Sequence, residues 1–146
     1  MSTESTPSED QIATLQSLPM DAPIAALNLF KFNERAQYRP ADPEFGTPDA
    51  DVSGQEAFAR YSAEAGAKLR GLGGRTVFAS SVDQVMIGPD APDFDLAAVM
   101  YFPTRSAFVA MLSDPEFQSS SRHRMAALAR HNMLHLAGDT FIDMAT

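Results

Sequence analysis

An arginine on the inward side of an expected helix has the clearest chemical potential in this sequence. The helix expected to begin at Asp114 carries apolar residues at Phe117 and Leu128. At about 100° per residue, Arg124 falls beside these two on the inward edge. A buried cation needs a carboxylate, carbonyl groups or an anionic ligand. Three interpretations of Arg124 follow. It forms a structural ion pair, its guanidinium extends to the solvent at the edge of the core, or it anchors the anionic or carbonyl end of a ligand.

Asn28 and the histidines are the next candidates. Asn28 shares a strand face with apolar residues, so its amide must be satisfied by the backbone or by a ligand. His123 lies on the flank of its helix, where it is either a partly exposed polar residue or a proton-transfer group. His131 and His135 share one face on a helix or a strand, but this spacing alone is a weak metal motif. We predict no metal site, and we expect His135 to line a cavity.

Two tyrosines and a second arginine complete the candidate ligand-binding set. Tyr61 and Tyr101 each add a hydroxyl to an apolar face, which core packing also explains. Arg75 follows a double glycine and could meet an anionic group or form a surface ion pair. No glycine-rich phosphate loop opens a helix, and no Gly-x-Ser-x-Gly motif is present. The sequence thus predicts neither a cofactor nor a nucleophilic hydrolase.

The composition and charge of the sequence argue against some classes of partner. The chain has 146 residues, a formal net charge of -8 and no cysteine. Its 11 basic residues are scattered, so we expect no nucleic-acid partner. The lack of cysteine favours the cytoplasm, and no apolar segment is long enough to suggest a membrane partner.

The order of the expected elements indicates the fold class. Residues 1–22 are expected to form a tail and a short helix capped at Ser8, and residues 23–146 to form a single domain. Within that domain we expect strands over 23–32, 75–87, 96–102 and 132–137. We expect helices starting after Ser53, Thr104 and Asp114, the last of which runs to about Arg130. The segment 33–51 has no periodicity, and Ser80 and Ser81 suggest a bulge or an irregular break in the strand. This order predicts an α+β, ferredoxin-like split βαβ domain with an antiparallel four-stranded sheet.

Two of the expected strands are apolar on both faces. A ferredoxin-like sheet has helices on one face only, so the second face must also be covered. The same face of another copy is the simplest cover, and we expect a homodimer.

Several short segments resemble an uncharacterised family, the domain of unknown function 1330, over roughly residues 23–136. The segments are Asn28–Phe32, Gly73–Arg75, Ile87–Gly88, Phe102–Thr104, Asp114–Phe117 and His123–Arg124. The resemblance implies a dimeric α+β barrel. Members of that superfamily include cofactor-independent monooxygenases, haem enzymes and isomerases, so the fold alone selects no reaction.

Three functions follow as hypotheses. The first is a homodimer that binds a small organic ligand in a mainly apolar cavity between sheet and helices. The second is a cofactor-independent oxygenase or isomerase, with His123 or His135 as base and Arg124 stabilising an enolate. The third is a subunit-interaction protein without a pocket.

Overall fold

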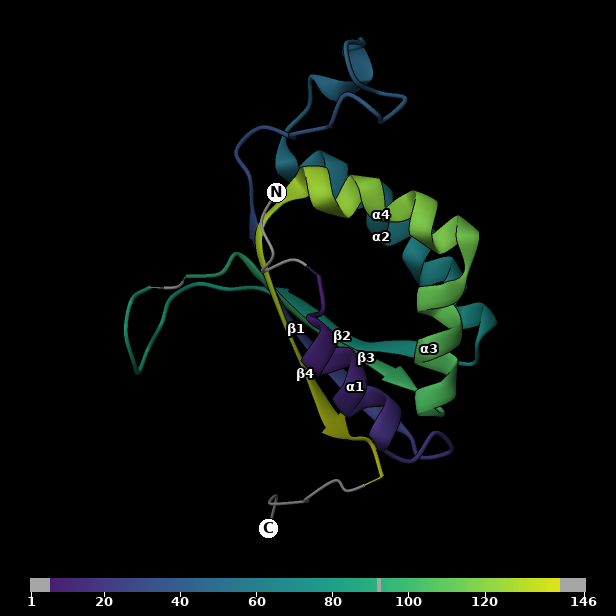
Figure 1. Cartoon of the computed structure of the whole chain (residues 1–146). Helices are drawn as coiled ribbons and strands as arrows, with labels where there is room; N and C mark the ends of the chain where they lie inside the picture. The colour runs from purple at the N-terminus through teal and green to yellow at the C-terminus, as the bar shows by residue number, and fades with distance from the viewer. Residues whose placement is uncertain (1–5, 92, 140–146) are drawn as a thin grey trace.

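The computed structural model describes residues 6–91 and 93–139, and it contains one four-stranded sheet with the strand order β2-β3-β1-β4. All three strand pairs are antiparallel. Helices α2, α3 and α4 lie on one side of this sheet (Figure 1). The elements in chain order are α1 (Glu9–Ser17), β1 (Ile24–Phe32), the 3-10 helix η2 (Pro48–Ala50), α2 (Gly54–Gly71), β2 (Arg75–Ser81), β3 (Leu96–Phe102), α3 (Arg105–Ser113), α4 (Pro115–Ala127) and β4 (Leu128–Ala137). This is the predicted ferredoxin-like α+β topology.

Side-chain caps begin the helices where the sequence predicts them. Ser8 forms a reciprocal capping box with Gln11 at the start of α1. The Ser53 hydroxyl accepts a hydrogen bond from the backbone of Glu56 at the start of α2. Asp114 ends α3 with its backbone N–H, which donates to the carbonyl of Met111, and its carboxylate caps α4, so the chain restarts a helix in a new direction at one residue.

Three predicted boundaries are wrong, each because of strand pairing. β2 ends at Ser81 and not at residue 87, because its partner β3 begins opposite it at Leu96. The register irregularity lies between Thr76 and Phe78 and not at the serine pair. α4 ends at Ala127 and not near residue 130, and β4 begins at once at residue 128. β4 pairs with β1 as far as Phe32, so residues 128–130, which were expected to be helical, form strand instead.

The register divides the side chains of the sheet between two faces. Ile24, Ala26 and Phe30 of β1 face the helices and are buried. Directly opposed residues of neighbouring strands share a face, so His131, Met133 and the other alternate residues of β4 also face the helices. In the described part of the chain no helix covers the opposite face (Figure 1), which carries the apolar residues Leu27, Leu29, Phe78, Val99, Leu134 and Leu136. We call this second face the open face.

The core between sheet and helices consists of two clusters. One is centred on Phe30, Phe58 and the end of α4, and the other on Ile24, Leu69 and Phe108. Tyr61 and Met100 pack against both clusters and therefore lie where they meet.

The segment before β1 is fastened to the start of α3. Leu15 of α1 packs against the second cluster. The Arg105 guanidinium donates to the carbonyl of Pro19, and its backbone N–H donates to Ala22. Within the described ranges, no helix is both long and apolar enough to cross a membrane.

Candidate functional site

A chain of polar side chains crosses the interior from β1 to α4. His131 Nε2 lies 2.8 Å from Asn28 Oδ1, and His131 Nδ1 lies 3.2 Å from Arg124 Nη1. The Asn28 amide nitrogen in turn lies 3.1 Å from the carbonyl of Ala26 and 3.3 Å from Met100 Sδ. We call Asn28, His131 and Arg124 the inner polar chain.

The hydrogen-bonding groups fix the protonation of this chain. A guanidinium can only donate, so Arg124 donates to His131 Nδ1. The single proton of the neutral imidazole is therefore on Nε2, which donates to Asn28 Oδ1. The Asn28 amide group is left to donate to Ala26 and Met100. Each hydrogen bond of the inner polar chain is thus donated in the same direction, from Arg124 on α4 toward β1.

Burial shifts the pKa values in this region toward neutral side chains. Desolvation and the neighbouring Arg124 charge lower the pKa of His131 to about 3. Desolvation lowers the pKa of Arg124 itself, with an opposing effect from Tyr61. Burial also raises the pKa of Tyr61. His131 is therefore neutral at physiological pH, which agrees with its two hydrogen bonds.

The helix-facing side of β4 is open to solvent next to the inner polar chain. Met133 is directly opposed to Asn28 and faces the helices, yet it is 42% exposed. His135 lies two residues further along on the same face and is also exposed, with Phe108 in edge contact at 4.6 Å between ring centroids. β4 is an edge strand, and among the described strands it pairs with β1 alone. Arg124 and His131, both partly buried, thus lie beside the exposed, helix-facing side chains of Met133 and His135, which we call the opening along β4.

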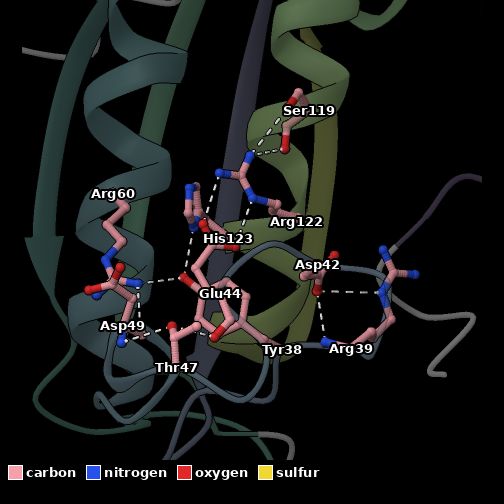
Figure 2. A network of polar contacts seen from close by, with 10 residues as sticks. All are labelled: Tyr38, Arg39, Asp42, Glu44, Thr47, Asp49, Arg60, Ser119, Arg122 and His123. Carbon is pink, nitrogen blue, oxygen red and sulfur yellow. Dashed lines mark hydrogen bonds and ion pairs between the residues drawn. The ribbon is translucent and has the colours of Figure 1, made fainter.

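A second polar network joins the 33–51 segment to α2 and α4 (Figure 2). Tyr38 Oη lies 2.7 Å from His123 Nδ1 and accepts a hydrogen bond from Arg60 Nη1 at 2.9 Å. Arg60 donates to the hydroxyl, and the hydroxyl donates to His123 Nδ1 in the tautomer that carries the imidazole proton on Nε2. Desolvation lowers the pKa of the buried His123.

An ion pair made by the preceding residue of α4 also holds the 33–51 segment. Arg122 donates from Nε and Nη2 to the two carboxylate oxygens of Glu44, each at 2.9 Å. This pair lowers the pKa of Glu44. A pocket of about 230 Å³ lies here, lined by Glu44, Asp49, Arg60 and His123. The segment is therefore held by side-chain contacts although only its short 3-10 helix is regular.

Another pocket, of about 420 Å³, lies at the end of the sheet near the start of α2. Its lining consists of Phe32, Asn33, Glu34, Ser53, Gln55, Ser81 and Asp95. Neither of these two pockets in the described ranges is the apolar cavity that we expected between sheet and helices.

The structure brings together some of the predicted site residues and separates others. Asn28, Tyr61 and Arg124 meet between sheet and helices, with His135 further along β4. His123 instead points toward the 33–51 segment. Arg75 and Tyr101 lie on the open face, where the guanidinium of Arg75 is 5.5 Å from the ring centroid of Tyr101.

His131 is the residue of the inner polar chain that is missing from the predicted site. The sequence pattern predicted that the last strand starts at residue 132, one residue after His131, whereas β4 starts at Leu128. His131 was considered only as part of a weak metal-binding pattern with His135. Its alternation with Met133 and His135 was the available signal. In residues 6–91 and 93–139 no group of three or more potential metal-ligating side chains is found.

The fold and the location of its polar residues define an α+β protein of the ferredoxin-like class. Residues 48–138 match the family described as Domain of unknown function (DUF1330), and the chain belongs to this family. No curated protein matches the chain.

Solved structures with a similar fold include a protein of unknown function from Rhodopseudomonas palustris. It is 27% identical, with a TM-score of 0.80 over 93% of this chain and 97% of that chain. A methylated form of that protein gives 28% identity and a TM-score of 0.81, covering 94% of this chain and 96% of the other. A protein from Bacteroides fragilis, described as dimeric, of unknown function and ferredoxin-like, is 11% identical with a TM-score of 0.42, covering 79% and 95% of the two chains.

Proposed function

We propose that this protein binds a small organic ligand whose anionic or carbonyl end contacts Arg124 at the opening along β4. One observation carries the proposal: within the inner polar chain, Asn28 and His131 hold the Arg124 guanidinium at the edge of an otherwise apolar interior. A guanidinium binds a carboxylate or carbonyl group well, because its N–H donors match the positions of the acceptor oxygens.

The surroundings of Arg124 favour an apolar ligand body. Tyr61 packs against Phe117 with 6.1 Å between ring centroids, and Met100 lies at the meeting point of the two core clusters. Met133 adds an exposed, flexible side chain at the mouth. A compact ring with one acidic group fits this combination of lining and charge.

Binding is favoured over the enzyme hypothesis by the position of the other histidines. His123 bonds Tyr38 of the 33–51 segment through Nδ1. His135 is four residues from His131 along β4, which is about 13 Å at the usual rise of a strand. Neither imidazole thus lies beside Arg124 as a base acting on the same small substrate would.

Benzoate and its uncharged analogue benzyl alcohol test this binding site. Saturation-transfer NMR on the wild-type protein should detect benzoate more strongly than benzyl alcohol. Arg124→Gln should abolish the benzoate signal, whereas Arg70→Gln, on the exposed end of α2, should leave it intact. Equal signals from the wild type and Arg124→Gln would overturn the proposal, provided that both proteins have the same circular dichroism.

We also propose that the functional form is a homodimer in which two open faces pack together. Leu134 is 49% exposed, and Leu136 and Phe78 are exposed to a similar degree on the same face. An apolar face of this kind is typical of an interface, and a two-fold axis buries it with a single contact.

Sedimentation velocity and native mass spectrometry test the dimer. Leu134→Lys should shift the wild-type dimer to a monomer, because a lysine at the centre of the interface would be desolvated without a partner. Phe45→Lys replaces an equally exposed apolar residue of the 33–51 segment and should leave the dimer unchanged. A monomeric wild-type protein at micromolar concentration would contradict the proposal.

A further inference from the structure

The connection between β2 and β3 carries the most exposed large apolar side chains that the structure describes. Met86 is 79% exposed and Ile87 is 93% exposed. They lie in residues 82–91, which we call the arm. In Figure 1 the arm extends to the left of the sheet, away from helices α2, α3 and α4 on the right. An isolated chain thus presents its most exposed apolar residues on a projection.

The base of the arm is fixed to the sheet. The backbone N–H of Val82 donates to the carbonyl of Asp95 at 3.0 Å. The backbone N–H of Asp95 in turn donates to the carbonyl of Phe30 at 2.7 Å. Lys31 forms ion pairs with Asp93 at 2.9 Å and with Asp95 at 3.3 Å. These contacts hold both ends of the connection, so the direction of the arm follows from the sheet.

The arm continues the apolar surface of the open face. β2 carries the exposed Phe78 on this face and leads directly into the arm at its end. The arm also carries the acidic residues Asp83 and Asp90, whereas Arg75 lies at the opposite end of β2 on the open face. In an isologous contact with the two-fold axis across the strands, the arm of each copy therefore reaches the Arg75 end of the other.

We propose that the arm docks on a second copy of this chain, with Met86 and Ile87 on its apolar open face and the arm acids beside Arg75 of that copy. The inference rests on the proposed homodimer and adds a specific contact to it. Each copy donates one arm and receives one, so the two contacts form together. Opposite charges at the two ends of β2 select the antiparallel arrangement over the parallel one.

Sedimentation measurements on the double variant Met86→Ser, Ile87→Ser test the energetic role of the arm. Its dimer dissociation constant should rise at least about tenfold, since apolar side chains buried at an interface carry much of its affinity. The matched control Phe45→Ser should keep the wild-type constant. An unchanged constant for the double variant, with a dimeric wild type, would overturn the arm contact alone. A monomeric wild type would overturn both the dimer and the arm contact.

A cross-link then locates the arm. The sequence has no cysteine, so Ile87→Cys can be labelled at one position with a benzophenone maleimide. Mixed dimers of labelled protein and isotope-labelled wild type should give cross-linked peptides that contain residues around Arg75 of the isotope-labelled copy. Cross-links confined to the labelled copy itself would contradict the proposal.

Discussion

His131 on β4 donates from Nε2 to Asn28 Oδ1 on β1 across 2.8 Å, although the two residues are not directly opposed. His131 is paired with Phe30, and Asn28 with Met133, so the hydrogen bond is diagonal across the two strands. The imidazole also lies against the Phe30 ring, with 4.6 Å between centroids. One histidine thus connects the sheet to Arg124 of α4.

Replacing Asn28 with Ala should lower the free energy of unfolding by about 2 kcal/mol, because it leaves the His131 N–H without its buried acceptor. Asn132→Ala, on the exposed part of the adjacent strand, should change it by less than about 0.5 kcal/mol. Urea denaturation at pH 7 measures both variants. Equal stabilities would contradict a structural role for the inner polar chain.

The stability of the protein should fall in acid because of His131. A histidine in the unfolded chain has a pKa of 6.5, whereas burial lowers the pKa of His131 in the folded chain to about 3. Between these values the unfolded chain binds a proton that the folded chain excludes, so unfolding becomes easier as the pH falls. Each pH unit in the middle of this range should cost about 1.4 kcal/mol.

The variant His131→Gln isolates this contribution. Urea denaturation of the variant and the wild type at pH 7, 5.5 and 4.5 should show a smaller loss for the variant, because glutamine does not titrate. The difference between the two proteins should therefore change with pH. Parallel stability profiles would contradict the assignment of the acid sensitivity to His131.

Tyr38→Phe should loosen the 33–51 segment. The hydroxyl that this change removes accepts from Arg60 and contacts His123, so Arg60 loses a partly buried hydrogen bond and His123 a buried one. We expect a loss of about 1–2 kcal/mol in stability and faster amide hydrogen exchange in residues 33–51. Tyr61→Phe removes a hydroxyl from the core beside α2 and should leave exchange in that segment unchanged.

The two ends of α2 should respond in opposite ways to alanine. A Cβ at Gly54 would lie 2.0 Å from the carbonyl oxygen of Asn33 and 2.8 Å from that of Ala127, so Gly54→Ala should destabilise the protein by about 3 kcal/mol. At Gly71 nothing lies within 4 Å, and Gly71→Ala should be neutral or stabilising by up to about 1 kcal/mol. Thermal unfolding of the two variants compares them directly, and similar effects would contradict the close packing at Gly54.

The sequence by itself determined the elements and their order. Capping residues such as Ser53 and Asp114 bond their own helix within three residues, and strand alternation depends on neighbours along the chain. These local signals placed β3 at residues 96–102 and identified the ferredoxin-like topology and the inward position of Arg124.

Tertiary structure decided which of those residues meet. Alternation shows which side chains share a face but not which face the helices cover, so Arg75 and Tyr101 lie on the open face, away from Asn28. Residues expected at the end of α4 form strand because they pair with β1, and as part of this strand His131 lies beside Arg124. Contacts between segments about 100 residues apart have no signature in either segment alone, which is why the inner polar chain emerged only from the folded molecule.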